Sequence, residues 1–339
     1  MEIATASAPW LRLAPSVWHD DQPLDRRGIA FEAGWFPTPL LSLAFRSQPD
    51  RYVAAGSRTF WSNEVELSHF SPPARLETRL AAGVFRRPAK TGSVEWIGRG
   101  ELGVRAGSGV TLRARLERSP YLSTVASLDT PLTSDTFTGL VQWTQRPGWL
   151  GEAAFLRQRF PDANQTRSGY AWALAPIAGR GHTQVQAGYS LATADADHDR
   201  FVLTRPEQPL PPSDPGFDFS GIYRPYYTPA RVVTHSVIGA ISAGRAAGPT
   251  FRSGGSYGFR ADEDATIFFS SGDAVATSTA RRSFRPWTAR ASFDVPAARG
   301  VTVSARAESG RTAFYRWTTV SVHVLVRFLP EGNGRPRFR

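Results

Sequence analysis

The sequence predicts an all-β protein: a transmembrane, antiparallel, up-and-down β-barrel of about sixteen strands. Three observations lead to this class. Segments in which apolar and polar residues alternate recur along the whole chain, and tight-turn sequences separate them in a regular order. In addition, no stretch approaches the roughly 18 to 20 consecutive apolar residues that a membrane-spanning helix needs. The 30 Gly and 26 Pro among 339 residues fit a chain with many turns.

The period-two alternation of a strand with one apolar face is clearest near the end of the chain. There, one face carries Val320, Val322, Val324, Val326 and Phe328, and the other carries Ser321, His323 and Arg327. In chain order we expect strands at residues 10–18, 28–36, 40–47, 62–70, 75–86, 94–106, 109–119, 136–146, 149–160, 168–177, 182–193, 230–245, 250–261, 284–296, 300–310 and 315–328.

The connections between these strands alternate between short and long. Outer-membrane barrels have short periplasmic turns and longer external loops, so seven tight turns imply eight hairpins with both termini on the periplasmic side. A soluble β-sandwich shares the residue alternation but not this order of connection lengths. The longest connections, 194–228 and 262–283, are expected to face outside. Turn-forming residues stand at 37–39, 71–73, 107–109, 146–148, 179–181, 247–249 and 299–300.

This reading divides the chain into an N-terminal extension (1–9), the barrel (10–328) and a C-terminal tail (329–339). The first residues, Met1-Glu2-Ile3, lack the basic and apolar segments of a secretory signal peptide, which an envelope protein needs. We therefore expect the chain to be the C-terminal part of a longer precursor, or to be truncated at its start. A cytoplasmic protein is the competing interpretation.

The net charge of +11 comes from arginine, because Lys90 is the only lysine. Such a balance can indicate an anionic partner such as nucleic acid, lipopolysaccharide or an acidic polymer. The arginines are spread along the chain rather than clustered in a basic arm, so we expect no nucleic-acid partner. The absence of cysteine excludes disulfides and thiolate metal sites.

Two groups of residues raise the question of catalysis or metal binding. Asp195, Asp197 and Asp199 alternate as in a calcium loop, but the turn glycine and the terminal Glu of an EF-hand are missing, so we interpret them as a solvated acidic loop. His235 and Ser236 are adjacent and would point to opposite faces of a strand, and no nucleophile-elbow motif is present. We expect no enzyme activity, no cofactor and no metal.

The polar face of the strands predicts a charged lumen. Paired, these side chains would brace the wall; unpaired, they would attract anions. The tryptophans near strand ends, in contrast, are expected at the lipid headgroup level: Trp10, Trp18, Trp35, Trp61, Trp96, Trp149, Trp287 and Trp317. The candidate pore-lining residues are Arg99, Glu101, Arg105, Arg113, Arg115, Glu117, Arg290, Arg306, Glu308 and Arg327.

Three stretches resemble the C-terminal outer-membrane barrel of bacterial cellulose-synthase C-type subunits, the exopolysaccharide exporters whose barrel follows a periplasmic tetratricopeptide-repeat region. The first runs from Arg118 through Ser127-Leu128-Asp129 to Gly139. The second is Tyr226-Tyr227-Thr228-Pro229-Ala230, similar to a Y-F-S-P-Q sequence of that family. The third is Phe314-Tyr315-Arg316-Trp317, which leads into the final strand; its end at Phe328 is similar to a barrel-assembly signal.

The resemblance implies a bacterial outer-membrane location and a passage for a cellulose-like exopolysaccharide. It also implies several partners: outer-membrane lipid, the barrel-assembly machinery acting through Phe328, a polysaccharide chain, and a periplasmic repeat-domain scaffold. Tyr226, Tyr227 and Pro229 are the loop residues that carry the motif. Two alternatives stay open from the residues alone: a general diffusion porin or solute channel, and a structural barrel plugged by its own loops.

Overall fold

The computed structural model describes residues 8–22, 24–54, 56–88, 93–107, 109–129, 132–145, 148–203, 221–245, 248–271, 274–313 and 315–329. It is nearly all β, and one antiparallel sheet closes on itself because β1 pairs with both β2 and β19. Seventeen strands belong to this sheet, but β16 and β17 follow one another along the same neighbour, β15. The wall is therefore a closed barrel of 16 strands, which confirms the predicted fold class.

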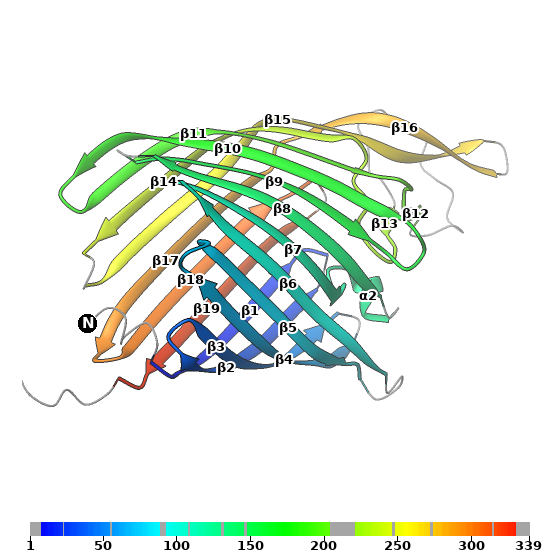
Figure 1. Ribbon diagram of the computed structural model, residues 1–339. Helices are drawn as coiled ribbons and strands as arrows, with labels where there is room; N and C mark the ends of the chain where they lie inside the picture. Colours follow the sequence, from blue (N-terminus) through cyan, green and yellow to red (C-terminus); the bar gives the residue numbers. More distant parts are fainter. Residues whose placement is uncertain are drawn as a thin grey trace, which may run out of the picture.

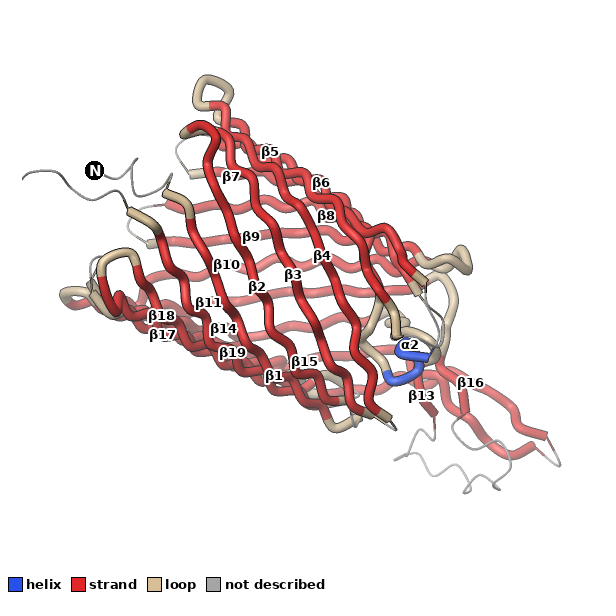
Figure 2. Tube along the Cα trace, turned by 90° about the horizontal axis from the view of Figure 1, so that it is seen from below, coloured by secondary structure: helices blue, strands red, loops and turns tan. Residues whose placement is uncertain are grey.

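The wall is built in chain order, with each strand beside the next (Figures 1 and 2). A small separate pair, β12 (Phe201–Leu203) and β13 (Gly221–Tyr223), and one short helix, α2 (Val125–Asp129), lie in the connections. The strands of the barrel sheet are β1 (Trp10–Asp20), β2 (Asp25–Thr38), β3 (Leu41–Val53), β4 (Ser57–Ser71), β5 (Leu76–Arg86), β6 (Val94–Ala106), β7 (Val110–Pro120), β8 (Thr133–Gln145), β9 (Trp149–Arg159), β10 (Gln165–Arg180), β11 (Thr183–Ala196), β14 (Val232–Gly244), β15 (Thr250–Ser271), β16 (Ala274–Phe284), β17 (Trp287–Ala298), β18 (Val301–Arg311) and β19 (Arg316–Arg327).

The two ends of the barrel differ. We call one the turn end, because it carries the tight turns that the sequence predicts, and the other the loop end. Both ends of the described chain meet at the turn end, where Phe328 N donates to Pro9 O at 2.8 Å. Gly300 shows why a turn there needs glycine: its φ is +77°, and a Cβ would lie 2.4 Å from the carbonyl oxygen of Arg327. In Figure 2, α2 and β16 lie at the loop end.

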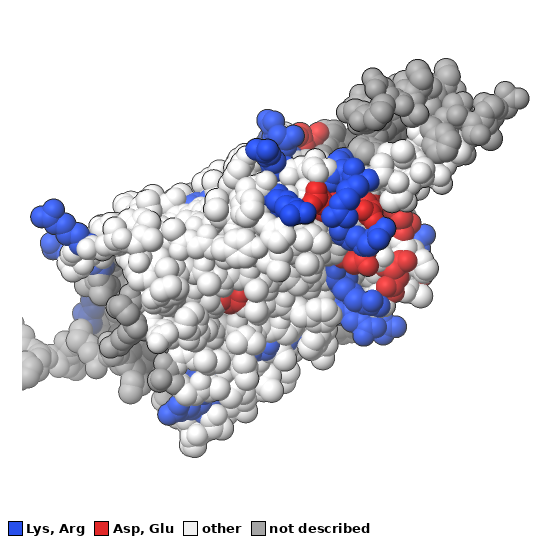
Figure 3. Space-filling view, turned by 90° about the horizontal axis from the view of Figure 1, so that it is seen from above, with Lys and Arg blue, Asp and Glu red and all other residues white. Residues whose placement is uncertain are grey.

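A closed sheet has two faces, and exposure distinguishes them. Large apolar side chains are exposed on one face, among them Trp96 (73%), Leu116 (64%) and Ile177 (64%). Figure 3 shows this outer face as a broad uncharged band, with charged side chains gathered toward the loop end. Such an apolar band is the surface that a membrane barrel presents to lipid. Among the residues described, no helix is long and apolar enough to cross a membrane.

The structure corrects the prediction at two connections. Residues 48–61 were expected to form a loop, but β3 runs to Val53 and β4 starts at Ser57. Residues 262–283 were also expected to be a loop, yet most of them extend the β15–β16 hairpin beyond the barrel wall (Figure 1). In both cases strand pairing continues past the point where the residue alternation ends, because cross-strand hydrogen bonds need no apolar face.

Candidate functional site: the lumen and its mouth

The inner face of strands β4 to β7 carries a connected set of ionic side chains. Arg99 pairs with Glu66, and Arg115 pairs with Glu117. Arg79 Nε donates to Glu77 Oε1 at 2.9 Å, and Glu101 lies opposite both Arg79 and Arg115 in the strand register. These contacts place four predicted residues (Arg99, Glu101, Arg115, Glu117) side by side on one wall.

A second set spans the seam where the barrel closes. Arg12 on β1 pairs with Glu32 on β2 at 3.3 Å and reaches His323 on β19 at 2.7 Å. Arg46 on β3 approaches Glu32 from the other side at 3.5 Å. Guanidinium groups thus cross-link the first strands to the last.

Several predicted residues have no such partner. Within the described ranges, Arg105, Arg113, Arg290 and Arg306 have no carboxylate within 4 Å. Arg105 lies over the ring of Phe70 at 5.8 Å, and Arg290 is the Cα partner of Glu308. Arg327 lies at the turn end opposite Trp10.

The prediction missed most partners of these arginines. Glu66, Glu77 and Arg79 complete the β4–β7 set, while Gln142 Nε2 and Tyr170 OH both donate to Glu152 at 2.7 Å on strands β8 to β10. The signal was present in the sequence. Residues 64–68 alternate between polar and apolar, as the other predicted strands do. This alternation places Glu66 on the polar face, which is the inner face.

The loop end holds an apolar cluster that the strand pattern does not predict. Leu128 of α2 packs with Leu24, Tyr52, Phe60, Phe85 and Ile97, which come from the inner wall of β3 to β6 and from the β1–β2 connection. Arg58 on β4 pairs with Asp129 at the end of the helix. The connection between β7 and β8 therefore folds inward and covers part of the barrel mouth.

A second segment, residues 221–231, meets the first. Thr124 Oγ1 donates to Pro225 O, and Tyr227 N donates to Tyr121 OH at 3.2 Å. Tyr226 is fully buried, and its ring stacks on Phe160 with centroids 3.6 Å apart. The predicted motif residues Tyr226, Tyr227 and Pro229 thus lie in the covered mouth, packed among loops.

Ionic contacts fasten this second segment to the β9–β10 connection. Tyr226 OH donates to both carboxylate oxygens of Asp162, at 2.8 and 2.7 Å, and Arg200 Nη2 donates to the same group at 2.5 Å. Burial alone would raise the pKa of Asp162, but the hydrogen bond from Tyr226 and the nearby Arg200 hold it below its ordinary value. Burial also raises the pKa of Tyr121 to about 12. The carboxylate stays ionised and the phenols stay protonated at neutral pH. We call the Tyr226, Asp162 and Arg200 contacts the latch.

Beside the covered part, a cavity of about 410 Å³ remains. Aromatic rings dominate its lining, together with one guanidinium: Trp18, Arg26, Tyr52, Leu122, Tyr315 and Trp317. The prediction for Trp18 and Trp317 is therefore wrong, because both face the interior. Trp10 also faces inward, against Gly34. The headgroup-level prediction failed because a tryptophan at a strand end can lie on either face of the wall. At the loop end the inner face carries the apolar cluster around Leu128, against which Trp18 packs.

The other sequence candidates have ordinary structural roles. Asp195 accepts the amide of Arg231, Asp197 pairs with Arg167, and Asp199 accepts from Thr228 Oγ1. In the part of the chain that is described, no group of three His, Asp or Glu is placed to hold a metal ion. His235 contacts Tyr189 OH on the outer face, whereas Ser236 is buried on the inner side.

Comparison with known proteins adds to this geometry. No family model and no curated protein matches the chain. A solved structure described as "Bacterial polysaccharide outer membrane secretin" matches with a TM-score of 0.67 at 12% identity, over 95% of this chain and 99% of that one. The chain has the fold of an outer-membrane barrel. OpdO of Pseudomonas aeruginosa matches this barrel with a TM-score of 0.45 at 10% identity, over 94% of this chain and 96% of that one. At such identities the likeness concerns the fold, and it does not extend to the cellulose-synthase C-type subunit suggested by the three sequence stretches.

Proposed function

We propose that the barrel passes an uncharged polysaccharide chain, of the cellulose-like kind, across the bacterial outer membrane. The observation that carries this proposal is the aromatic cavity at the mouth. Trp18, Tyr52, Tyr315 and Trp317 line it beside the inward-folded connection. Aromatic rings offer the apolar faces of sugar rings a large contact area at low cost in side-chain entropy.

The lumen supports the same proposal. Acidic and basic side chains are interspersed on the wall of β4 to β7, and several of them are paired, so that stretch of wall offers no single-sign field to hold a charged solute. A chain of neutral sugars could instead exchange many weak hydrogen bonds with these groups as it slides. The solved structure with a TM-score of 0.67 is itself described as a polysaccharide secretin.

Current blockade by oligosaccharides tests the proposal. The full chain is refolded in detergent, its folding is checked by heat-modifiable gel migration, and single channels are recorded in a planar bilayer. Neutral β-1,4-linked gluco-oligosaccharides are expected to cause transient blockades, and Trp18→Ala with Trp317→Ala should shorten them. Trp35→Ala is the matched control, because Trp35 is 51% exposed on the outer face. Steady conductance without blockades would contradict the proposal and favour a general diffusion porin.

One observation favours a second candidate, a structural barrel closed by its own loops. The latch and α2 together tie the mouth to strands β3 to β6 and to the β9–β10 connection. A folded wild-type chain that conducts no ions, but conducts when α2 is removed, would support this candidate instead.

The remaining partners belong to the same proposal. We propose insertion by the barrel-assembly machinery, for which Phe328, 53% exposed after β19, would be the signal. We also propose a periplasmic repeat-domain scaffold and no catalysed reaction.

A further inference from the structure

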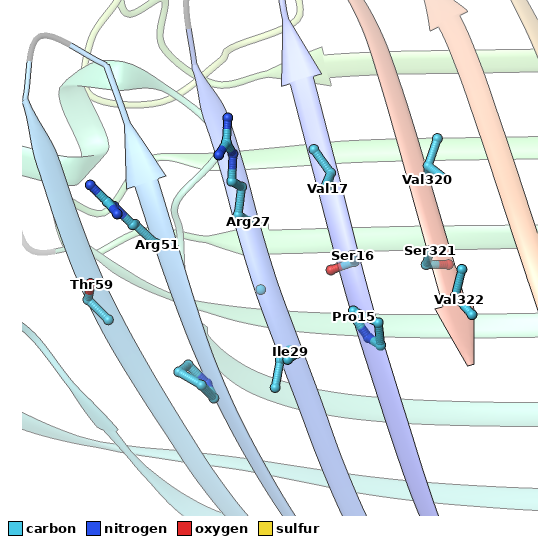
Figure 4. Close-up of a pocket in the computed structure, with 12 residues that line it drawn as sticks. Pro15, Ser16, Val17, Arg27, Ile29, Arg51, Thr59, Val320, Ser321 and Val322 are labelled. Atoms are coloured by element: carbon cyan, nitrogen blue, oxygen red, sulfur yellow. The ribbon is translucent and has the colours of Figure 1, made fainter. Parts of the chain in front are cut away.

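The outer face of β2 and β3 carries two like charges directly opposite each other near the loop end. Arg27 and Arg51 are Cα partners, and both are exposed. Figure 4 shows them on neighbouring strands. Like charges at directly opposed positions of an antiparallel pair destabilise it. Among the described residues, neither guanidinium has a carboxylate within 4 Å, and the hydrogen bond from Arg51 Nε to Ser57 Oγ (2.7 Å) adds no charge.

Below the two arginines lies an apolar groove of about 520 Å³. The apolar side chains in its lining are Pro15, Val17, Ile29, Pro49, Val320 and Val322. Figure 4 shows Ile29 on the same strand as Arg27, Val17 on the neighbouring strand β1, and Val320 on β19, the strand beyond it. An apolar groove that ends at two cations matches an amphiphile with an anionic head.

Two prolines explain why the outer surface of the wall is depressed at this groove. The β1–β19 register passes from Leu13 to Ser16 without pairing Pro15, and the β2–β3 register passes from Gly28 to Phe31 without pairing Pro49. Proline cannot donate to the ladder, and its short ring fills less space than the neighbouring valines or isoleucine. The groove thus lies where Pro15 and Pro49 reduce the number of hydrogen bonds between strands.

The position of the groove in the membrane indicates which kind of lipid it binds. With both chain ends on the periplasmic side, the loop end lies in the outer leaflet, and the arginines lie near its headgroup level. Two guanidinium groups without a carboxylate suit a phosphomonoester, which accepts paired N–H bonds from arginine. A zwitterionic phospholipid would instead bring an ammonium group toward two cations. The geometry points to a binding site for lipopolysaccharide, with a lipid A phosphate between Arg27 and Arg51 and an acyl chain in the groove.

A similar groove on β6 to β9 also has arginines in its lining, but a carboxylate lies among them. It has a volume of about 590 Å³ and lies between Trp96, Leu116 and Phe137. There, Arg118 pairs with Asp135 at 3.1 Å, and Arg159 is the Cα partner of the same aspartate. Arg157 Nε donates to Gln165 Oε1 at 2.8 Å. The groove beside Arg27 and Arg51 has no carboxylate in its lining, so we assign the phosphate to these two arginines.

The test compares binding of bisphosphorylated lipid A and dephosphorylated lipid A to the full refolded chain, in detergent micelles, by native mass spectrometry. The test variant is Arg27→Gln with Arg51→Gln. The matched control is Arg180→Gln with Arg245→Gln, which removes the same charge from exposed positions at the turn end. Heat-modifiable migration confirms that each variant is folded.

We expect the test variant to bind bisphosphorylated lipid A about tenfold more weakly than the wild type and the control variant. The wild type should also bind dephosphorylated lipid A about tenfold more weakly than bisphosphorylated lipid A. This comparison needs no variant. Equal binding by both variants would overturn the assignment. So would equal competition by phosphatidylglycerol, because the groove would then be a general phospholipid surface.

Discussion

The wall and the mouth of this barrel are held together in different ways. On the wall, ionic partners lie on the same strand or at most two strands apart, as in Arg115 with Glu117 and Arg99 with Glu66. At the mouth, contacts join residues that are far apart in sequence, such as Tyr226 with Asp162 and Thr124 with Pro225. Similar ion pairs recur along the wall, so the loss of one pair should leave the others in place. At the mouth, each contact holds a segment that the other contacts also hold, so the loss of one should weaken the rest. We therefore expect changes at the mouth to alter passage, and changes on the wall to alter stability and selectivity.

The largest effect should follow from opening the mouth. Replacing residues 122–129 by two glycines removes α2 and the Leu128 contact with the inner wall. We expect single-channel conductance to rise several-fold, because the inward-folded connection no longer narrows the opening. The measurement is planar-bilayer conductance of the refolded variant.

Its control shortens a different hairpin at the same end. Replacing residues 267–278 by Asn-Gly trims the β15–β16 extension, which projects away from the wall (Figure 1). Conductance of this variant should match wild type. An equal rise in both variants would mean that α2 does not narrow the passage.

A smaller effect should follow from loosening the latch. Tyr226→Phe keeps the ring on Phe160 but removes the hydroxyl that donates to Asp162. The loss of this partly buried hydrogen bond to a charged group should cost about 1 kcal/mol. Hydrogen exchange of amides 221–231 should become faster, while exchange in the strands stays unchanged. Tyr189→Phe, which loses a hydroxyl contact to His235 on the outer face, should leave these amides unaffected.

The difference between wall and mouth also explains which parts of the structure could be predicted from the sequence. The order of the wall strands and the tight turns follow from local patterns and were predictable, whereas β3, β4 and the β15–β16 hairpin extend beyond the predicted strand ends. The inner-face assignment of Arg99 and Glu117 needed only a period of two. The aromatic cavity was not predictable in this way, because Trp18 of β1 and Trp317 of β19 meet Leu122 of the β7–β8 connection, which is far from both in sequence. No local alternation marks α2, whose five residues are stabilised by tertiary packing rather than by helix propensity.

On the wall, removing one ionic partner should have a modest effect on stability. Glu66→Gln leaves Arg99 without its carboxylate, which we expect to cost about 1 kcal/mol in a partly exposed site. It should also shift ion selectivity toward anions. Glu64→Gln is the control, since Glu64 shares the strand and the face but has no cation within 4 Å among the described residues. Both variants should shift reversal potential, and only Glu66→Gln should lower the midpoint of urea unfolding; equal midpoints would show that the pair does not brace the wall.

The smallest effect is a pH response confined to acid conditions. The pKa of Asp162 is lower in the folded protein than its ordinary value of 3.8, so the carboxylate stabilises the latch above that value, and this contribution is lost as pH falls through the lowered pKa. The difference in protection of amides 221–231 between wild type and Asp162→Asn, corrected for intrinsic exchange, should be the same at pH 8 and pH 5 and should shrink below about pH 4. A latch that loosened between pH 8 and pH 5 would require a titrating group other than Asp162. The mouth, unlike a histidine-gated channel, should therefore keep one conformation across the pH range in which a cell envelope functions.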